Sequence, residues 1–403
     1  MACSLAPAQV PSAFGVNTHR TNANDIKLIA AAGFTYIRTD FFWQYTETQR
    51  GNYDFSEYDA LMAQLNEQGL KALFILDFNN ALYQPGSDKL GPSNAAVFTA
   101  YANWALAAVS HFQGRGVVWE IWNEPNNAPF WGPAPNVHHY MAMAKAASLA
   151  IKGAHPKEIL IGPSSTFSDR NTISSREPNN GLSFLNACFG LGLLNIVDGV
   201  SEHSYRPRAA NPETVLDFYA AMQDLMRKHR QTLPIVSSEW GYSRTEVDEA
   251  TQAKYVVRSF LCNAIAGVPL SIWYDWSDDG VDTRNREDNF GLVSGNAERT
   301  PHEGYMAAKI FNSVAKDGKF QGRLPDTAID DYVVKYQTPT GPVYIAWTTR
   351  RAHSASLPIG GGAFQVTNYL GDAQPNAKAE SVLLDDGPHY IRPSSANPPL
   401  QIR

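Results

Sequence analysis

The chain has 403 residues, of which 44% are hydrophobic and 18% are charged, and its formal net charge is -6. These proportions are typical of a globular protein and exclude a disordered chain, which would have fewer apolar residues and a stronger charge imbalance. A mildly acidic chain without a basic run is not expected to bind nucleic acid. Length alone permits one large domain with a small companion, or two or three average domains.

Cysteine usage and the N-terminal segment bear on the cellular compartment. Cys3, Cys188 and Cys262 are odd in number and widely separated, so neither a disulfide framework nor a structural metal is indicated. No apolar run approaches the ~20 residues of a membrane span, and Met1 to Val10 lacks the basic and apolar parts of a signal peptide. We expect a secreted or periplasmic protein whose signal peptide has been removed, in preference to a cytoplasmic one.

Short apolar runs rich in β-branched and aromatic residues alternate with longer segments of helical period, a pattern typical of a parallel α/β protein. The predicted strands are Ala13 to His19, Phe34 to Trp43, Leu70 to Phe78, Gly116 to Pro125, Glu158 to Ser165, Val197 to Tyr205, Pro234 to Tyr242 and Pro269 to Ser277. Predicted helices between them include Asn94 to Phe112 and Asn211 to His229, in which Asn211 can cap the first turn.

Eight strand-helix units in ~320 residues predict a (β/α)8 TIM barrel with insertions. A doubly wound sheet usually has fewer such units. No glycine-rich phosphate loop follows the first predicted strand, which argues against a nucleotide-binding sheet. The predicted fold class is therefore an α/β barrel.

After a helix at Gly304 to Val314 the sequence changes to short alternating strands separated by Gly, Pro and Asp. These predicted strands are Tyr332 to Tyr336, Val343 to Trp347, Phe364 to Leu370 and Ser381 to Leu384. They favour a small C-terminal antiparallel β-sandwich over a continuation of the barrel or a disordered tail. The predicted domains are a catalytic barrel at 1–318 and an accessory sandwich at 319–403.

In a (β/α)8 barrel the active site lies at the C-terminal ends of the strands, so polar and aromatic residues that end the apolar runs are the candidates for chemistry. In chain order these are Asn17 and His19, then Arg38, Asp40 and Trp43, then Asp77 and Asn79, then Asn123 and Glu124, then Ser164 and Ser165, then His203 and Tyr205, then Glu239 and Trp240, and last Asp275 and Trp276.

Two of these strand ends carry a glutamate in a distinctive setting. Glu124 follows Trp119 to Asn123 and precedes a proline that ends the strand, and Glu239 ends the seventh predicted strand. Strands four and seven lie on opposite sides of an eight-stranded barrel, so the two carboxyl groups can face each other across its mouth. The alternative is a pair of structural strand-end carboxylates.

Facing carboxyl groups are what glycoside hydrolysis requires, since one protonates the leaving oxygen while the other attacks or stabilises the anomeric carbon. A separation of roughly 5 to 5.5 Å gives retention through a covalent glycosyl-enzyme, whereas roughly 6.5 to 9.5 Å leaves room for water and gives inversion. The sequence names the pair but not the distance between its members.

The two motifs, Trp-Asn-Glu-Pro and Ser-Glu-Trp-Gly, resemble the signatures of glycoside hydrolase clan A, the retaining (β/α)8 glycosidases. The layout also contains His-Ser-Tyr after the sixth strand, Asn-Phe-Gly-Leu-Val at 289–293 and the C-terminal sandwich. It is most similar to family 39, with family 5 next. Family 39 includes β-xylosidases, iduronidases and hydrolases of bacterial exopolysaccharides.

The resemblance implies a role for each matching residue. Glu124 becomes the general acid/base, Glu239 the nucleophile, and Asn123 the partner of the sugar 2-hydroxyl. The remaining implied roles are Arg38 and Tyr205 holding the nucleophile ionised, His203 lying near the acid/base, and Trp276 forming the floor of a sugar subsite. The acid is expected to have a raised pKa, supplied by apolar walls and by the ionised partner nearby.

Strand-end position alone suggests further sugar contacts, because tryptophan can stack on a sugar ring and polar side chains can bind hydroxyls. These candidates are Trp43, Trp240, Asn79 and His19. Glu120 shares strand parity with Glu124 and is expected to be structural, neutralised by Arg38 as a buried pair.

Neither of two further polar clusters predicts a metal site. His138 and His139 are expected to form a solvated first turn of a helix. The acidic loop of Asp275, Asp278, Asp279, Asp282 and Asp288 does not follow the EF-hand rule and is expected to line the rim of the cleft. No metal or cofactor is expected.

The sequence thus predicts a retaining hydrolase of β-glycosidic bonds that binds an oligo- or polysaccharide, with a monomer as the expected state. Aromatic strand ends suggest several subsites and hence action within a polysaccharide or exopolysaccharide chain. An exo-acting enzyme similar to β-xylosidases and a catalytically silent carbohydrate-binding barrel remain the alternatives. A barrel aldolase would need a strand-end lysine, and a metal-dependent hydrolase more strand-end histidines, and neither is found.

Overall fold

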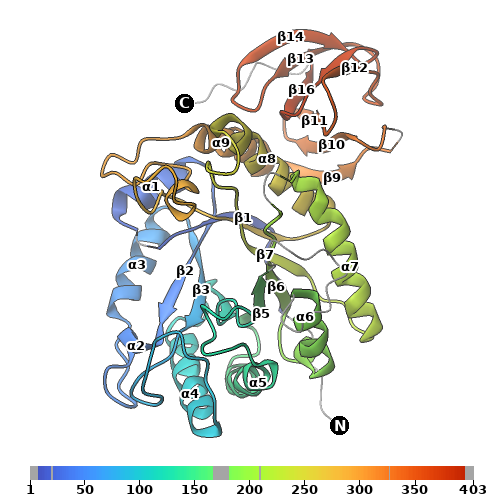
Figure 1. The fold of residues 1–403 in the computed structure, drawn as a ribbon. Helices are drawn as coiled ribbons and strands as arrows, with labels where there is room; N and C mark the ends of the chain where they lie inside the picture. The colour runs from blue at the N-terminus through green and yellow to red at the C-terminus, as the bar shows by residue number, and fades with distance from the viewer. Residues whose placement is uncertain (1–7, 20, 167–180, 208–209, 326, 395–403) are drawn as a thin grey trace.

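A computed structural model describes residues 8–19, 21–166, 181–207, 210–325 and 327–394. Its first eight strands are parallel and close into a barrel in chain order (Figure 1). They are β1 (Ala13–Asn17), β2 (Tyr36–Phe42), β3 (Lys71–Asp77), β4 (Val118–Ile121), β5 (Ile159–Thr166), β6 (Gly199–His203), β7 (Ile235–Trp240) and β8 (Leu270–Trp273). The predicted (β/α)8 barrel is confirmed.

Helices surround the barrel and connect its strands. They are α1 (Ala23–Ala31), α2 (Trp43–Thr46), α3 (Ser56–Glu67), α4 (Ala95–His111), α5 (Val137–Ala154), α6 (Gly181–Gly190), α7 (Val215–Lys228), α8 (Glu249–Ile265) and α9 (Glu303–Ala315), with short 3-10 turns η1 (Leu193–Asn195), η2 (Pro212–Thr214) and η3 (Glu287–Asn289). None of the helices in the described ranges is long and apolar enough to cross a membrane.

Side-chain capping explains where several helices begin. Asn94 accepts hydrogen bonds from the backbone amides of Ala96 and Val97 at the start of α4, which satisfies donors that have no partner within the helix. The prediction that the Asn211 side chain caps a helix is wrong, because this side chain makes no capping hydrogen bond. It accepts instead from Tyr255 and Arg258 of α8, so a tertiary contact replaces the local one.

The barrel interior is divided into an apolar lower layer and a polar upper one. The lower layer consists of buried side chains from Tyr36, Leu73, Ile75, Val118, Ile161, Val236, Leu270 and Ile272. Strand residues two positions further on point to the same side, so Arg38 on β2 and Glu120 on β4 lie above this layer, towards the C-terminal mouth. The apolar layer therefore supports a charged site.

The C-terminal residues form two antiparallel sheets (Figure 1). The larger sheet has the order β14-β13-β16-β11-β10-β9 and the smaller one pairs β12 with β15. Their bounds are β9 (Lys319–Arg323), β10 (Asp331–Thr338), β11 (Gly341–Thr348), β12 (His353–Ala355), β13 (Ala363–Thr367), β14 (Ala373–Lys378), β15 (Val382–Leu384) and β16 (His389–Pro393). The predicted sandwich is confirmed, although four of its strands, β9, β12, β14 and β16, are not predicted from the sequence.

Alternation along β10 explains how the sandwich is attached. Val333 belongs to the core between the two sheets, whereas Tyr332, Val334 and Tyr336 belong to the large core shared with the barrel helices. Tyr336 lies edge-on to Phe311 of α9, with ring centroids 6.2 Å apart. Most of β10 is therefore buried on both faces, and in Figure 1 the large sheet lies beside α8 and α9.

Candidate active site

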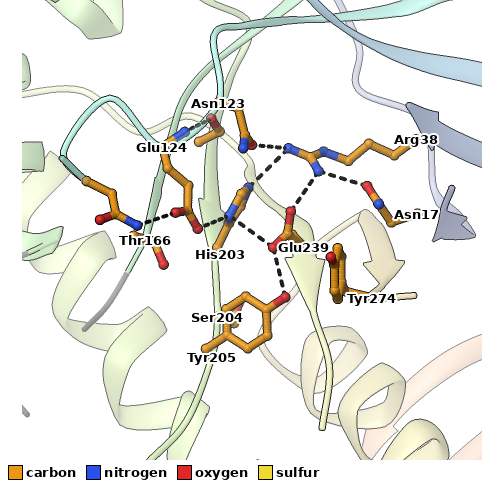
Figure 2. A network of polar contacts seen from close by, with 12 residues as sticks. Asn17, Arg38, Asn123, Glu124, Thr166, His203, Ser204, Tyr205, Glu239 and Tyr274 are labelled. Atoms are coloured by element: carbon orange, nitrogen blue, oxygen red, sulfur yellow. Dashed lines mark hydrogen bonds and ion pairs between the residues drawn. The ribbon is translucent and has the colours of Figure 1, made fainter. Parts of the chain in front are cut away.

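Glu124 lies three residues beyond the end of β4, where the backbone leaves the extended conformation. Trp122 and Glu124 both have positive φ, 67° and 45°, a conformation that is costly for residues with a side chain. It is held by Ser164 of β5, whose backbone oxygen and Oγ each accept from the Glu124 amide at 3.2 Å, while its hydroxyl donates to the Trp122 carbonyl at 2.9 Å. The turn directs the Glu124 carboxylate towards His203 (Figure 2).

Glu239 lies near the end of β7 and is held from two sides (Figure 2). Arg38 donates from Nη1 to Glu239 Oε2 at 2.9 Å, and the Tyr205 hydroxyl donates to Oε1 at 2.8 Å. Each oxygen of the carboxyl group therefore accepts a hydrogen bond from a side chain of another strand or loop. The side chain is 11% exposed, so it is screened from bulk water and yet accessible from the barrel mouth.

Arg38 is the centre of the polar layer. Its Nε donates to Glu120 at 2.8 Å and its Nη1 also donates to Asn17 at 2.9 Å, while Nη2 donates to Asn123 at 2.8 Å. A planar guanidinium can serve several acceptors at once. The expected buried pair between Glu120 and Arg38 is therefore present, and one arginine connects β1, β2, β4 and β7.

His203 at the end of β6 lies between the two glutamates. Its Nδ1 is 2.8 Å from Glu124 Oε1 and 3.5 Å from Glu239 Oε1. Its Nε2 is 3.2 Å from Arg38 Nη2, and because arginine can only donate, Nε2 must accept that bond. Nδ1 therefore carries the hydrogen and donates it to Glu124.

The two carboxylates are close together. One oxygen of Glu124, one oxygen of Glu239 and a ring nitrogen of His203 all lie within 4.8 Å of one another. Glu124 is 6% and Glu239 is 9% exposed. The two catalytic candidates are therefore nearly buried at the barrel mouth.

The pKa of Glu124 differs from the expectation for a general acid. Burial raises it, but the hydrogen bond that His203 donates to Oε1 and the hydrogen bond that Asn127 Nδ2 donates to Oε2 at 2.7 Å together lower it below the ordinary value. The expectation of a raised pKa, based on apolar walls and the ionised partner nearby, is wrong for the protein without substrate. Two donors held by the fold outweigh desolvation.

Asn127 and Tyr274 belong to the site but were not predicted from the sequence, whereas Asn17 and Ser164 were named there only as strand-end candidates without a role. Asn127 contacts Glu124, Asn17 contacts Arg38, and Ser164 holds the turn at Glu124. The hydroxyl of Tyr274, just after β8, lies 3.0 Å from His19 Nε2, and Figure 2 places its ring beside Glu239. Asn127 closely follows the Trp-Asn-Glu-Pro motif and Tyr274 follows the end of β8, so position could have indicated both.

Four of the candidate sugar contacts are buried by neighbouring elements and are not exposed to a substrate. Trp43 is fully buried, stacks on Trp104 and Tyr83, and donates its indole N–H to Glu47. Trp240 is 1% exposed and Asn79, also 1% exposed, donates to the carbonyls of Gln84 and Ser87. Strand-end position alone therefore selected core residues, because the helices and loops behind the barrel also pack against these ends.

Trp276 is the fourth of them and corrects a role implied by the family resemblance. Its indole N–H donates to Asp25 of α1 at 2.9 Å, and its ring packs edge-on to Tyr305 of α9. The residue is 1% exposed. It anchors helices to the barrel and cannot form the floor of a sugar subsite in this conformation.

The two other polar clusters contact residues of their own neighbourhood. His138 and His139 donate their backbone amides to the Asn136 cap of α5, as expected for a first helical turn. In the acidic loop, Asp278 accepts two hydrogen bonds from Arg244, and His302 lies 2.9 Å from it. Asp275 and Asp279 instead lie near His19.

Comparison with known proteins identifies the family to which the chain belongs. Residues 5–280, more than half of the chain, match the model of the family described as Cellulase (glycosyl hydrolase family 5). The chain belongs to this glycosyl hydrolase family. Two predictions from the sequence, the resemblance to glycoside hydrolase clan A and the glycosidase activity class, are thereby confirmed.

Other proteins similar to this glycosyl hydrolase are a β-xylosidase and two solved structures of family 39 enzymes. A β-xylosidase from Geobacillus stearothermophilus is 26% identical over 188 residues, which cover 39% of this chain and about a third of that protein. A family 39 glycoside hydrolase from Bacteroides cellulosilyticus WH2 superposes with a TM-score of 0.78 at 24% identity, covering 95% of this chain and 81% of that one. A family 39 β-xylosidase from Caulobacter crescentus gives 0.69 at 16% identity and covers 98% of both chains. These structures share the fold.

Proposed function

We propose that this glycosyl hydrolase cleaves β-glycosidic bonds with retention of configuration, with Glu239 as nucleophile and Glu124 as general acid/base. One observation carries the proposal: oxygens of the two carboxylates lie within 4.8 Å of each other. Inversion requires the two carboxyl groups to be separated by roughly 6.5 Å or more, because a water molecule must fit between sugar and base. Direct attack by a carboxylate, which gives retention, requires a shorter separation.

The first step forms a covalent glycosyl-enzyme. Glu239, whose two oxygens are positioned by Arg38 and Tyr205, attacks the anomeric carbon while Glu124 protonates the leaving oxygen. The bond from carbon to the leaving oxygen breaks as the ester bond forms. Asn123, whose Oδ1 is fixed by Arg38, can present its amide N–H to the sugar 2-hydroxyl.

In the second step Glu124 removes a proton from water, which attacks the anomeric carbon and releases Glu239. The ionised Glu124 needed here is the form that His203 and Asn127 favour in the protein without substrate. For the first step Glu124 must instead hold a proton. We therefore propose that a bound sugar excludes water from Glu124 and raises its pKa, since desolvation already acts in that direction.

A second proposal concerns whether the enzyme cleaves within a polysaccharide chain or releases sugars from its end. Tyr45 in α2, directly after β2, is 64% exposed and lies edge-on to Phe42 with ring centroids 5.2 Å apart. An exposed aromatic at the mouth supports a sugar subsite beyond the cleavage point and thus action within a polysaccharide or exopolysaccharide. The similarity to a β-xylosidase favours the second candidate, an exo-acting enzyme on xylosides.

The nucleophile assignment is tested with Glu239→Gln, which keeps the shape of the side chain. Turnover of an activated aryl β-glycoside is expected to fall below detection while the circular dichroism spectrum is unchanged. Glu124→Ala should slow substrates with poor leaving groups far more than activated ones, and azide should restore part of the rate. Wild-type activity in both variants would exclude the assignment. Glu57→Gln, an exposed change on α3, serves as the control.

Stereochemistry and mode of attack need separate measurements. Proton NMR during hydrolysis should show the β-anomer first, and first appearance of the α-anomer would reject the nucleophilic role of Glu239. Product sizes from a panel of polysaccharides and xylo-oligosaccharides, measured by mass spectrometry, distinguish the modes. Internal cleavage yields oligomers early, whereas exo action releases a single sugar.

A further inference from the structure

Three metal-ligand side chains gather beside the nucleophile, and the proposed reaction does not use them. His19 lies just beyond β1, and Asp275 and Asp279 follow β8; together they are called the β1–β8 cluster. His19 Nε2 is 3.7 Å from Asp275 Oδ2 and 4.0 Å from Asp279 Oδ2. One ligand atom from each of the three residues lies within 4.8 Å of the other two.

Asp275 lacks the partners that a buried carboxylate needs. Its side chain is 2% exposed, and Oδ1 has no hydrogen-bond partner among the described residues. Burial, followed by the charges of Asp279, Asp278 and Glu287, raises its pKa well above the ordinary value. Buried polar atoms without a partner are rare in native proteins and often mark a missing ion or water molecule.

The basic side chains nearby already have partners. Arg244 is committed to Asp278, and Arg286 donates to Glu246 at 2.9 Å. Within the described ranges, Asp275 and Asp279 form ion pairs only with His19. When both carboxyl groups are ionised, the β1–β8 cluster therefore has more negative charge than the surrounding cations neutralise.

We propose that the β1–β8 cluster binds a divalent metal ion. Imidazole is a ligand suited to zinc, whereas carboxylates suit manganese, so the mixed set favours Zn²⁺ or Mn²⁺. Ligand atoms around a tetrahedral zinc lie about 3.4 Å apart, so the separations of 3.7 and 4.0 Å need only a small contraction. Tyr274, now 3.0 Å from His19 Nε2, can turn its hydroxyl fully to Glu287, which it already approaches at 3.5 Å.

The position of such an ion suggests its role. The side chains of His19 and Asp279 are 42% and 38% exposed, so an ion at this position would be open to the barrel mouth. It would connect the ends of β1 and β8 and could bind sugar hydroxyls on the side of Glu239 that faces away from Glu124. The same carboxylates could hold a protonated amino sugar, but His19, a common metal ligand, favours the metal.

Isothermal titration of the chelator-treated full chain with ZnCl₂ and MnCl₂ tests this site. One ion per chain is expected to bind at micromolar or lower concentration, and Mn²⁺ should show the altered spin-resonance spectrum of a bound ion. Asp279→Asn and His19→Gln should each weaken binding at least about tenfold. Asp282→Asn changes the same loop outside the cluster and should bind like the wild type.

The catalytic group provides a second control, because Glu124, His203 and Glu239 could also hold a metal. Glu239→Gln must retain the binding, and its loss in that variant would place the ion at the catalytic pair and overturn the proposal. Absence of binding by both ions, or unchanged binding in Asp279→Asn, would overturn it as well. Titration with glucosamine oligomers that depends on Asp279, in the absence of metal binding, would assign the cluster to an amino sugar instead. None of these readouts requires hydrolytic activity, so failure of the proposed function would be recognised separately.

Discussion

At the scale of single residues, Arg38 determines the arrangement of the site. Three guanidinium nitrogens contact Asn17, Glu120, Asn123, His203 and Glu239. Only a planar side chain with five N–H donors can do this, since the ammonium of lysine is a compact charge with three donors. The side chain is 1% exposed, so each lost bond leaves a buried acceptor without a partner.

We expect Arg38→Lys to lower kcat/KM by about 10²-fold or more, as does removal of a preorganised donor from an active site. The free energy of unfolding should fall by about 1–3 kcal/mol, because a buried acceptor loses its hydrogen bond. Steady-state kinetics and urea unfolding measure the two effects. Arg284→Lys, at an exposed arginine that pairs with Asp282, should change neither. Activity within twofold of the wild type in Arg38→Lys would contradict the role.

Asn127 gives a prediction about pH at the same scale. It donates to Glu124 Oε2 and is among the causes that lower the Glu124 pKa. Asn127→Ala removes this bond, so the pKa of Glu124 should rise. Because the first step needs protonated Glu124, the decline of kcat/KM on the alkaline side should then begin at higher pH. A profile of kcat/KM against pH checks this, and a shift to lower pH, or none, would reject it.

At the scale of elements, β6 separates two environments. His203 at its end contacts both catalytic carboxylates, whereas Glu202 is completely buried and lies with Ser204 and Tyr219 of α7. Ser204 donates to Glu202, but burial is the larger effect and raises the pKa of Glu202 to about 7. The strand thus carries an acid that titrates near neutral pH directly behind the site.

Stability should therefore decrease as pH rises through the pKa of Glu202. The folded pKa of about 7 lies above the ordinary 4.5, so the folded state holds the proton more tightly. The stabilising contribution is fully present below the ordinary value and is lost as pH rises through about 7. A shift of this size corresponds to about 3 kcal/mol.

The variant Glu202→Gln cannot ionise and should lose this dependence. Urea unfolding of both proteins at mildly acidic and mildly alkaline pH measures the difference between them. Glu57→Gln, on the exposed face of α3, should keep the wild-type slope. An identical slope in Glu202→Gln would show that Glu202 does not titrate in this range.

At the scale of the whole molecule, one buried carboxylate joins the barrel to the sandwich. Glu213 of η2 accepts two hydrogen bonds from Arg258 of α8, at 2.8 and 2.6 Å, and one from the indole of Trp347 on β11, at 2.6 Å. Together with the shared apolar core, this contact holds the two units as one body. The boundary between the two units is still proposed at residue 319, where β9 begins.

Disrupting this junction should cost stability without affecting chemistry. Glu213→Ala leaves Arg258 buried without its partner and should lower the free energy of unfolding by about 3–5 kcal/mol. Trp347→Phe removes one donor and should cost about 1–2 kcal/mol. Lys254→Ala, which breaks the partly exposed pair with Asp386, should cost at most about 1 kcal/mol. Calorimetry measures these differences, and equal effects of Glu213→Ala and Lys254→Ala would contradict the junction.

The sequence by itself determined the barrel, the sandwich and the pairing of Glu124 with Glu239. These features follow from local patterns, because strand and helix periods, motif residues and strand order are all written along the chain. Parallel strands in a barrel bring their C-terminal ends together, so two glutamates 115 positions apart could be paired before any distance was known.

Only the tertiary structure decided which strand-end side chains face the mouth and which are buried behind it. Trp43, Trp240 and Trp276 follow the same pattern as the site residues and yet are at most 1% exposed. The lowered pKa of Glu124 and the β1–β8 cluster likewise depend on contacts between distant segments. Burial, hydrogen-bond distance and local charge are set by packing across the whole barrel, and no single stretch of sequence contains them.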